Sequence, residues 1–322
     1  MATLVTGGAG FIGSALAANL AAAGEAVVVL DNFNDFYDPA LKRANAARLE
    51  ALGVEIVEGD VRDSDGVERV VANHAIRRIA HLAALANVRA SIEQAPLYMQ
   101  VNAIGSLNVL EAARRGELEN VVLASTSSVY GRGERIPFRE DDPADRPLAS
   151  YPASKRAAEI LGHSYTNLFG LPVTALRFFN VYGPAGRPDM MPLRLMRAIS
   201  HGEAVPIFSE GRMERDWTYI DDVVAAVAAA VQRPMGYEVI NLGLGAPIPL
   251  NDFIETVELL AGRKLIRVDA PAPPSEPPIT FCDNAKARRL LDFDPTVPVR
   301  EGLARTWEWF RAQATGDRDP SA

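Results

Sequence analysis

The chain has little of what disulfide-bonded, membrane-spanning or nucleic-acid-binding proteins need. It holds one cysteine, Cys282, so an internal disulfide and a cysteine-based zinc site are both impossible, and we expect a packed core thiol and no metal. No segment approaches the ~18 apolar residues that cross a bilayer. The 33 Lys and Arg against 41 Asp and Glu give a net charge of −8, which argues against nucleic acid as the main partner. The chain starts directly with a strand pattern, so we expect a soluble, cytoplasmic protein.

What the chain does have is a composition typical of globular proteins, with 322 residues, 48% hydrophobic and 23% charged. Its first half alternates short apolar runs with helical patterns, which predicts βαβ units and a parallel sheet. The expected strands are 2–6, 26–31, 54–60, 78–82, 120–125 and 173–179. The expected helices between them are 12–23, 65–73, 101–115 and 151–168.

After about residue 183 this order loosens. Pro- and Gly-rich segments at 183–192 and 270–278 separate expected helices at 191–201, 221–232, 249–261, 283–291 and 300–314. We therefore predict an α/β fold, a Rossmann-type doubly wound parallel sheet with a smaller, mixed C-terminal substrate-binding domain. The predicted nucleotide-binding domain is 1–183 with 216–243 returning to it, the substrate domain is 184–215 and 244–314, and 315–322 is a disordered tail.

A glycine-rich turn is the first functional signal. Gly7, Gly10 and Gly13 follow the first strand and open a helix. Glycines at these positions permit a tight turn and a close approach of the backbone to a pyrophosphate, whose charge the amides of the helix start would bind. The pattern predicts a dinucleotide site.

Acidic residues at two further strand ends favour one dinucleotide. Asp31 ends the second strand, where a carboxylate can accept hydrogen bonds from the adenosine ribose. It would repel a 2′-phosphate, and Asn32 rather than an arginine follows it, so the sequence favours NAD over NADP. Asp60 ends the third strand and is expected to meet the adenine amino group; the alternative is a helix cap.

A tyrosine and a lysine stand four residues apart at 151–155. The intervening Pro152 suits the first helical position, so Tyr151 and Lys155 are expected on one face of a helix. A nearby ammonium favours the phenolate and lowers the pKa of the tyrosine, which would make the pair a general acid/base for a sugar hydroxyl.

The glycine spacing and the Tyr-x-x-x-Lys pair resemble the extended short-chain dehydrogenase/reductase family. Further stretches resemble the UDP-glucuronate 4-epimerases of that family, namely 31–39, 41–43, 81–84, 88–89, 177–184, 186–190 and 215–222. The resemblance runs from residue 2 to about 292. It implies an NAD-dependent isomerase that interconverts UDP-glucuronic and UDP-galacturonic acid by oxidation and re-reduction at C4, through a 4-keto intermediate.

The resemblance also implies the site residues. The catalytic set is Tyr151, Lys155 and Thr126. The cofactor-binding set is Gly7, Gly10, Phe11, Ile12, Gly13, Asp31, Asn32, Asp60, Val61, Leu82, Ala83, Ala84, Asn102, Tyr151, Lys155 and Phe178. The substrate-binding set is Ser127, Ser128, Arg89, Asn180, Arg187, Arg215 and Glu276. In it Arg187 would hold the sugar or its carboxylate, Arg215 the diphosphate and Glu276 the ribose hydroxyls, although either arginine could instead form a structural ion pair.

Departures from the family's patterns keep alternatives open. Nucleotide-sugar dehydratases carry an Asp-Glu pair, and UDP-glucuronate decarboxylases a Glu, where this chain has Ser127 and Ser128, which disfavours both. Asn180 resembles UDP-galactose 4-epimerases instead. A non-catalytic NAD-binding regulator is the alternative of a different class. Helices 101–115 and 151–168 resemble a family dimer interface, so we expect a homodimer, although their apolar residues would equally serve a monomer core.

Overall fold

The computed structural model describes residues 2–133 and 135–316, and its centre is a parallel sheet of seven strands. The strand order is β10-β6-β5-β4-β1-β2-β3, so the chain starts in the middle and winds outward both ways. The strands are β1 (Ala2–Thr6), β2 (Ala26–Asp31), β3 (Glu55–Glu58), β4 (Ile76–His81), β5 (Asn120–Thr126), β6 (Val173–Phe178) and β10 (Tyr237–Leu242). Their inner members are buried on both faces, as apolar parallel strands require. The predicted Rossmann-type α/β fold is confirmed.

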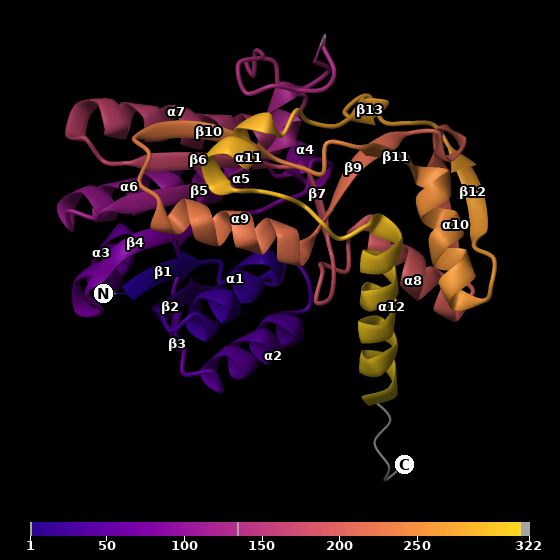
Figure 1. Cartoon of the computed structure of the whole chain (residues 1–322), viewed down its shortest axis with the longest axis horizontal. Helices are drawn as coiled ribbons and strands as arrows, with labels where there is room; N and C mark the ends of the chain where they lie inside the picture. The colour runs from indigo at the N-terminus through magenta and orange to yellow at the C-terminus, as the bar shows by residue number, and fades with distance from the viewer. Residues whose placement is uncertain (1, 134, 317–322) are drawn as a thin grey trace.

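Helices cover both faces of this sheet (Figure 1). On one face α1 (Phe11–Ala22) packs against α9 (Ile220–Gln232) in the larger apolar core. On the other face α3 (Ser64–Asn73), α6 (Gly105–Arg115) and α7 (Ser150–Phe169) enclose a second core. The short helices α4 (Ala90–Glu93), α5 (Ala95–Tyr98) and the π-helix η1 (Met99–Ile104) precede α6.

The remaining elements form a smaller mixed part beside the carboxyl ends of the large sheet (Figure 1). Strand β9 (Glu214–Tyr219) pairs with β7 (Asn180–Tyr182), β11 (Pro247–Pro249) and β13 (Ile279–Thr280), and β8 (Ala204–Phe208) pairs with β12 (Ile266–Ala270). Helices α8 (Met191–His201), α10 (Leu250–Ala261) and α12 (Val299–Gly316) pack around them, and α11 (Ala285–Leu291) contacts β10. The predicted division into two domains stays a prediction.

Several expected elements differ from those observed. Helix α2 (Pro39–Glu50) was not predicted, because its inward face carries little more than Ala46 and Leu49. The expected helix 101–115 begins as a π-turn and becomes α-helical only at Gly105. Helix α12 continues to Gly316, two residues into the expected disordered tail, and 317–322 lie outside the described residues. Within 2–133 and 135–316, no helix is long and apolar enough to cross a membrane.

Candidate active site

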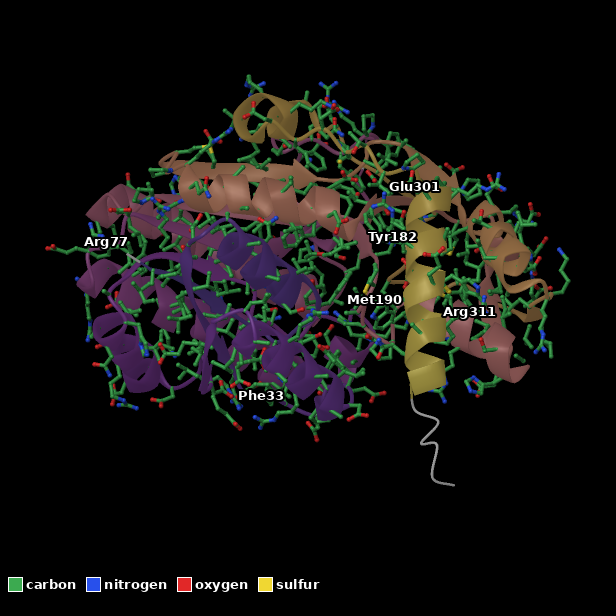
Figure 2. All side chains as sticks on the ribbon, turned by 60° about the horizontal axis from the view of Figure 1, so that its bottom comes forward. Phe33, Arg77, Tyr182, Met190, Glu301 and Arg311 are labelled. Carbon is green, nitrogen blue, oxygen red and sulfur yellow. The ribbon has the colours of Figure 1, made fainter. Side chains whose placement is uncertain are left out.

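A cavity opens at the carboxyl ends of the central strands. It lies at the point where the strand order reverses, between β1 and β4, which is where open parallel sheets bind their ligands. Met190, which is labelled in Figure 2, also lines the cavity. The expected cofactor residues that line the cavity are Gly7, Gly10, Phe11, Ile12, Gly13, Asp31, Asn32, Asp60, Val61, Leu82, Ala83, Ala84, Tyr151, Lys155 and Phe178.

The glycine turn leaves no room for side chains. Gly7 has φ of 68°, and a Cβ there would lie 2.6 Å from the amide nitrogen of Ala83. Gly10 is the N-cap of α1 and supplies no side chain to bond the amides of the first helical turn. Those amides therefore face the cavity with partial positive charge, which suits a phosphate group.

Three polar side chains mark the neighbouring strand ends. Asp31 is buried and accepts hydrogen bonds from the amides of Ala9 (3.1 Å) and Phe33 (2.9 Å). Asn32 donates its side-chain amide to Asp60 at 2.8 Å. Hydrogen bonds from Arg62 lower the pKa of Asp60 to about 2, so this carboxyl is ionised at neutral pH. Asp60 is not the cap of α3, because Asp63 fills that position.

Tyr151, Lys155 and Thr126 come together in the same cavity. Tyr151 stands in the first turn of α7, Lys155 follows one turn later, and Thr126 ends β5 and hydrogen-bonds Tyr151. The Lys155 side chain is almost completely buried, and its Nζ has no hydrogen-bond partner among the described residues. Burial lowers the pKa of Lys155 to about 8.

The pKa of Tyr151 differs from our expectation. Burial raises it above its ordinary value, and this effect exceeds the opposing influence of the Thr126 hydroxyl and the Arg187 guanidinium. The expected lowering by Lys155 is therefore wrong for this structure, in which Thr126 and Arg187, and not Lys155, oppose the effect of burial on the pKa of the phenol. Any lowering of the phenol pKa needs a further positive charge in the cavity.

A buried ion pair supports the floor of this site. Glu159, one turn beyond Lys155 on α7, accepts two hydrogen bonds from Arg177 on β6, at 2.9 and 2.8 Å. It also accepts one from Ser125 at 2.5 Å, and Ser125 lines the cavity beside Thr126. Glu159 is the opposing charge that favours the protonated form of Lys155. The sequence analysis did not include Glu159 or Arg177 in the site.

Of the expected substrate residues, Arg187 alone lines the cavity. Its guanidinium is paired with Asp189 (2.7 Å) and also donates to the carbonyl oxygen of Ala86. Ser127 and Ser128 form a short 3-10 turn after Thr126, and Asn180 opens β7. Glu276 pairs with Arg89 (3.3 Å) and Arg215 (3.0 Å), so it joins the large part of the molecule to the small sheet.

Asn102 lies behind the cavity wall rather than on it. It is completely buried, and its side-chain amide bonds the backbone of Leu85 in both directions and the hydroxyl of Ser154. These contacts occupy the side-chain amide of Asn102. It can therefore influence a ligand only through the position of the loop at Leu85. The sequence analysis also missed cavity residues of the 32–42 segment, Asn34, Phe36, Tyr37 and Lys42, although the family resemblance covered the segment.

A doubly wound parallel sheet with a glycine turn and a Tyr–Lys pair in one cavity defines a dinucleotide-binding protein of the Rossmann class. Residues 3–243 match the model of the NAD dependent epimerase/dehydratase family, and the chain belongs to that family.

Relatives and solved structures agree with this assignment. The chain is 40% identical over 310 residues to a UDP-glucuronate 4-epimerase of Thermodesulfobacterium geofontis, covering 96% of this chain and 95% of the relative. A Bacillus cereus UDP-glucuronic acid 4-epimerase, solved with UDP-glucuronic acid and NAD, superposes with a TM-score of 0.91 at 33% identity, covering 97% of this chain and 100% of that one. A Thermotoga maritima UDP-glucose 4-epimerase, solved with UDP-glucose, superposes with a TM-score of 0.90 at 30% identity, covering 98% and 100%.

The cavity fits the dinucleotide that gives the family its name. The ammonium of Lys155, which is buried and has no hydrogen-bond partner in 2–133 and 135–316, suits a ribose hydroxyl, and the glycine turn suits the pyrophosphate. Asp31 suits the hydroxyls of the other ribose. These three features come from different parts of the chain, and together they match the two ends and the middle of one ligand.

Proposed function

We propose that the protein is an NAD-dependent UDP-glucuronate 4-epimerase, an isomerase that interconverts UDP-glucuronic acid and UDP-galacturonic acid. The observation that carries the proposal is the presence of Arg187 in the same cavity as Tyr151 and Lys155. A partly buried guanidinium is suited to a carboxylate, and the phenol–ammonium pair is suited to a secondary hydroxyl. The names of the relatives support the same substrate.

The residues of the chain divide the work of this reaction. Tyr151 takes the proton of the C4 hydroxyl and later returns it, and the Thr126 hydroxyl bonds the same oxygen. Lys155 holds the cofactor ribose, and its charge lies one helical turn from the phenol. The chemistry that bound NAD would supply is reversible hydride transfer at C4, with no net oxidation of the sugar.

The 4-keto form of a uronic acid is a β-keto acid and loses CO₂ when the carboxylate bond aligns with the carbonyl. An epimerase therefore has to hold the carboxylate away from that alignment. We assign this task to Arg187, the expected substrate residue that lines the cavity. Asp189 fixes the guanidinium by two hydrogen bonds, at 3.0 and 2.7 Å, so that its direction is set before the substrate enters.

UDP-glucose 4-epimerase is the second candidate. Asn180 favours it, because an asparagine at this position resembles UDP-galactose 4-epimerases. The Thermotoga maritima structure shows that the same fold is used by an enzyme of that name. Apart from Arg187 and Asn180, the site residues named above suit both substrates equally.

The test compares kcat/KM for UDP-glucuronic acid and UDP-glucose in the wild type and in Arg187→Met. We expect the variant to lose most of its preference for the uronate, roughly 10- to 100-fold, which is the contribution of a hydrogen bond to a charged group. Arg197→Met, which removes an exposed arginine of α8, is the control and keeps the preference. A wild type that turns over only UDP-glucose would support the second candidate.

We also propose a homodimer and a cytoplasmic location. Ile160, Leu168 and Phe169 on α7, with Ile104 before α6, are exposed apolar side chains on the two helices that the family resemblance indicated. A second copy would cover them. Sedimentation should show a dimer that Ile160→Glu weakens. The single, buried cysteine is compatible with a reducing compartment, and cell fractionation tests the location.

A further inference from the structure

The segment after β2 is held by a ladder of side-chain hydrogen bonds. The amide of Phe33 donates to Asp31 (2.9 Å), that of Asn34 to Asn32 (3.1 Å), and that of Phe36 to Asn34 (3.1 Å). Side chains of Asp and Asn that bond the backbone two residues further on stabilise consecutive turns. The ladder turns the segment 32–37 into one wall of the cavity.

Lys42, on α2, is fastened to the middle of this ladder. Its side chain is buried, and its Nζ donates to the carbonyl oxygen of Asn34 (2.9 Å) and to the side-chain Oδ1 of the same residue (2.8 Å). The ammonium also lies 4.8 Å from the centre of the Tyr37 ring. Because Oδ1 of Asn34 also accepts the amide of Phe36, one lysine stabilises both halves of the ladder.

The same helix and the same loop reach the glycine turn. Asn45, one turn after Lys42, donates to the carbonyl oxygen of Ala9 at 3.0 Å. The hydroxyl of Tyr37 lies 3.9 Å from the position of a Cβ on Gly10. The wall formed by 32–37 therefore closes the cavity on the side of the glycine turn and Asp31.

The charged groups around Lys42 explain why the lysine is tolerated there. Burial lowers its pKa and the Arg187 guanidinium acts in the same direction, whereas Asp31 and Asp35 oppose them. A buried ammonium is costly unless hydrogen bonds and opposite charges compensate for its lost hydration. Asn34 supplies the hydrogen bonds, and the two carboxylates supply the charge.

We propose that Lys42 is a positioning residue for the dinucleotide, which through Asn34 holds the wall 32–37 closed and so sets how long NAD stays bound. The inference rests on the proposed NAD dependence and adds a residue to it. An epimerase returns its cofactor to the starting state in every turnover, so slow release of NAD is a requirement for such an enzyme.

The test measures NAD directly. Wild type, Lys42→Met, Asn34→Ala and the double variant are purified, and the NAD that each retains is released by acid and quantified. The rate of NAD loss is then followed after dilution into an NAD-trapping enzyme. Each single variant should lose NAD roughly tenfold faster than the wild type, the order expected for hydrogen bonds to a charged group. The double variant should be no faster than either single one, because both act through the same contact.

Two further variants complete the design. Lys42→Arg keeps donors for Asn34 and should restore retention, and Arg48→Met removes an exposed charge from the same helix and should leave it unchanged. Retention by Lys42→Met equal to the wild type, or effects of the two single variants that multiply, would overturn the inference. If Lys42→Met does not fold, Asn34→Ala replaces it in the test. Retention of NAD by Asn34→Ala equal to the wild type would then overturn the inference. A wild type that neither contains nor takes up NAD would contradict the proposed function instead.

Discussion

Lys155 should lower the stability of the NAD-free protein relative to a variant with an uncharged side chain at the same position. Its side chain is 2% exposed, and its Nζ has no hydrogen-bond partner among the described residues. Burial lowers its pKa from 10.5 to about 8. A difference of that size between the folded and unfolded chains corresponds to about 3 kcal/mol. We therefore expect Lys155→Met to stabilise the NAD-free protein by up to about 3 kcal/mol at pH 7 while abolishing turnover.

The pH dependence gives this prediction its sign. The unfolded chain holds the lysine proton more tightly than the folded one, so stability rises with pH between about 8 and 10.5. The penalty is fully present below pH 8 and absent above 10.5. The stability advantage of Lys155→Met should accordingly be largest near pH 7 and fade towards pH 10.5.

The assay is urea unfolding of the NAD-free wild type and variant at several pH values. Lys264→Met, whose lysine is 84% exposed, is the matched control and should show no such pH-dependent gain. A variant that is equally or less stable than the wild type at pH 7 would refute the reasoning. So would a gain of the same size at pH 7 and pH 10.5.

Three other predictions follow from the same contacts. Tyr151→Phe should lower the initial rate by roughly 10²- to 10⁴-fold with unchanged NAD content, since general acid/base groups contribute that much; near-normal turnover would exclude the phenol as the base. Glu159→Gln should cost roughly 3–5 kcal/mol in urea unfolding, because Arg177 is left buried without its counter-charge; a loss below about 1 kcal/mol would mean that water or other groups replace it. Asn102→Ala should cost roughly 1–3 kcal/mol by leaving the backbone of Leu85 unpaired, and unchanged stability would contradict the contacts of this amide.

The large sheet could be predicted because each of its strands carries its own apolar pattern. The middle of a strand that is buried on both faces, such as 121–124 in β5, has to be apolar, and that pattern is visible without neighbours. The small sheet offers no such pattern. β11 contains two prolines in three residues and β13 is two residues long, so both exist only through pairing with β9.

Helix α2 has the sequence features of a helix start but lacks apolar periodicity. Asp38 caps it and Pro39 occupies its first turn, both of which are typical of a helix start. Only a narrow part of it is buried, so the apolar periodicity that identifies most helices was missing. Because α2 was not predicted, Lys42 had no expected place, although it lies on the cavity wall.

In the candidate site, the spacing of residues along the chain predicted which side chains lie together. The depth at which each side chain is buried could not be predicted in this way. The spacing of four positions from Tyr151 to Lys155 was enough to expect both on one helix face. The direction of the pKa of Tyr151 depends on how deeply the phenol is buried, which no spacing reveals. Asn102 and Glu159 similarly owe their positions to contacts between distant segments, with Leu85 and with Arg177.

The most direct test of the proposed function is the product of one reaction. The purified protein is incubated with UDP-glucuronic acid without added cofactor, and the sugar nucleotides are separated and their configuration at C4 determined by proton NMR. We predict UDP-galacturonic acid, formed up to a constant ratio and without accumulation of NADH. Release of a UDP-4-keto-pentose as the major product, or no conversion even with added NAD, would contradict the account.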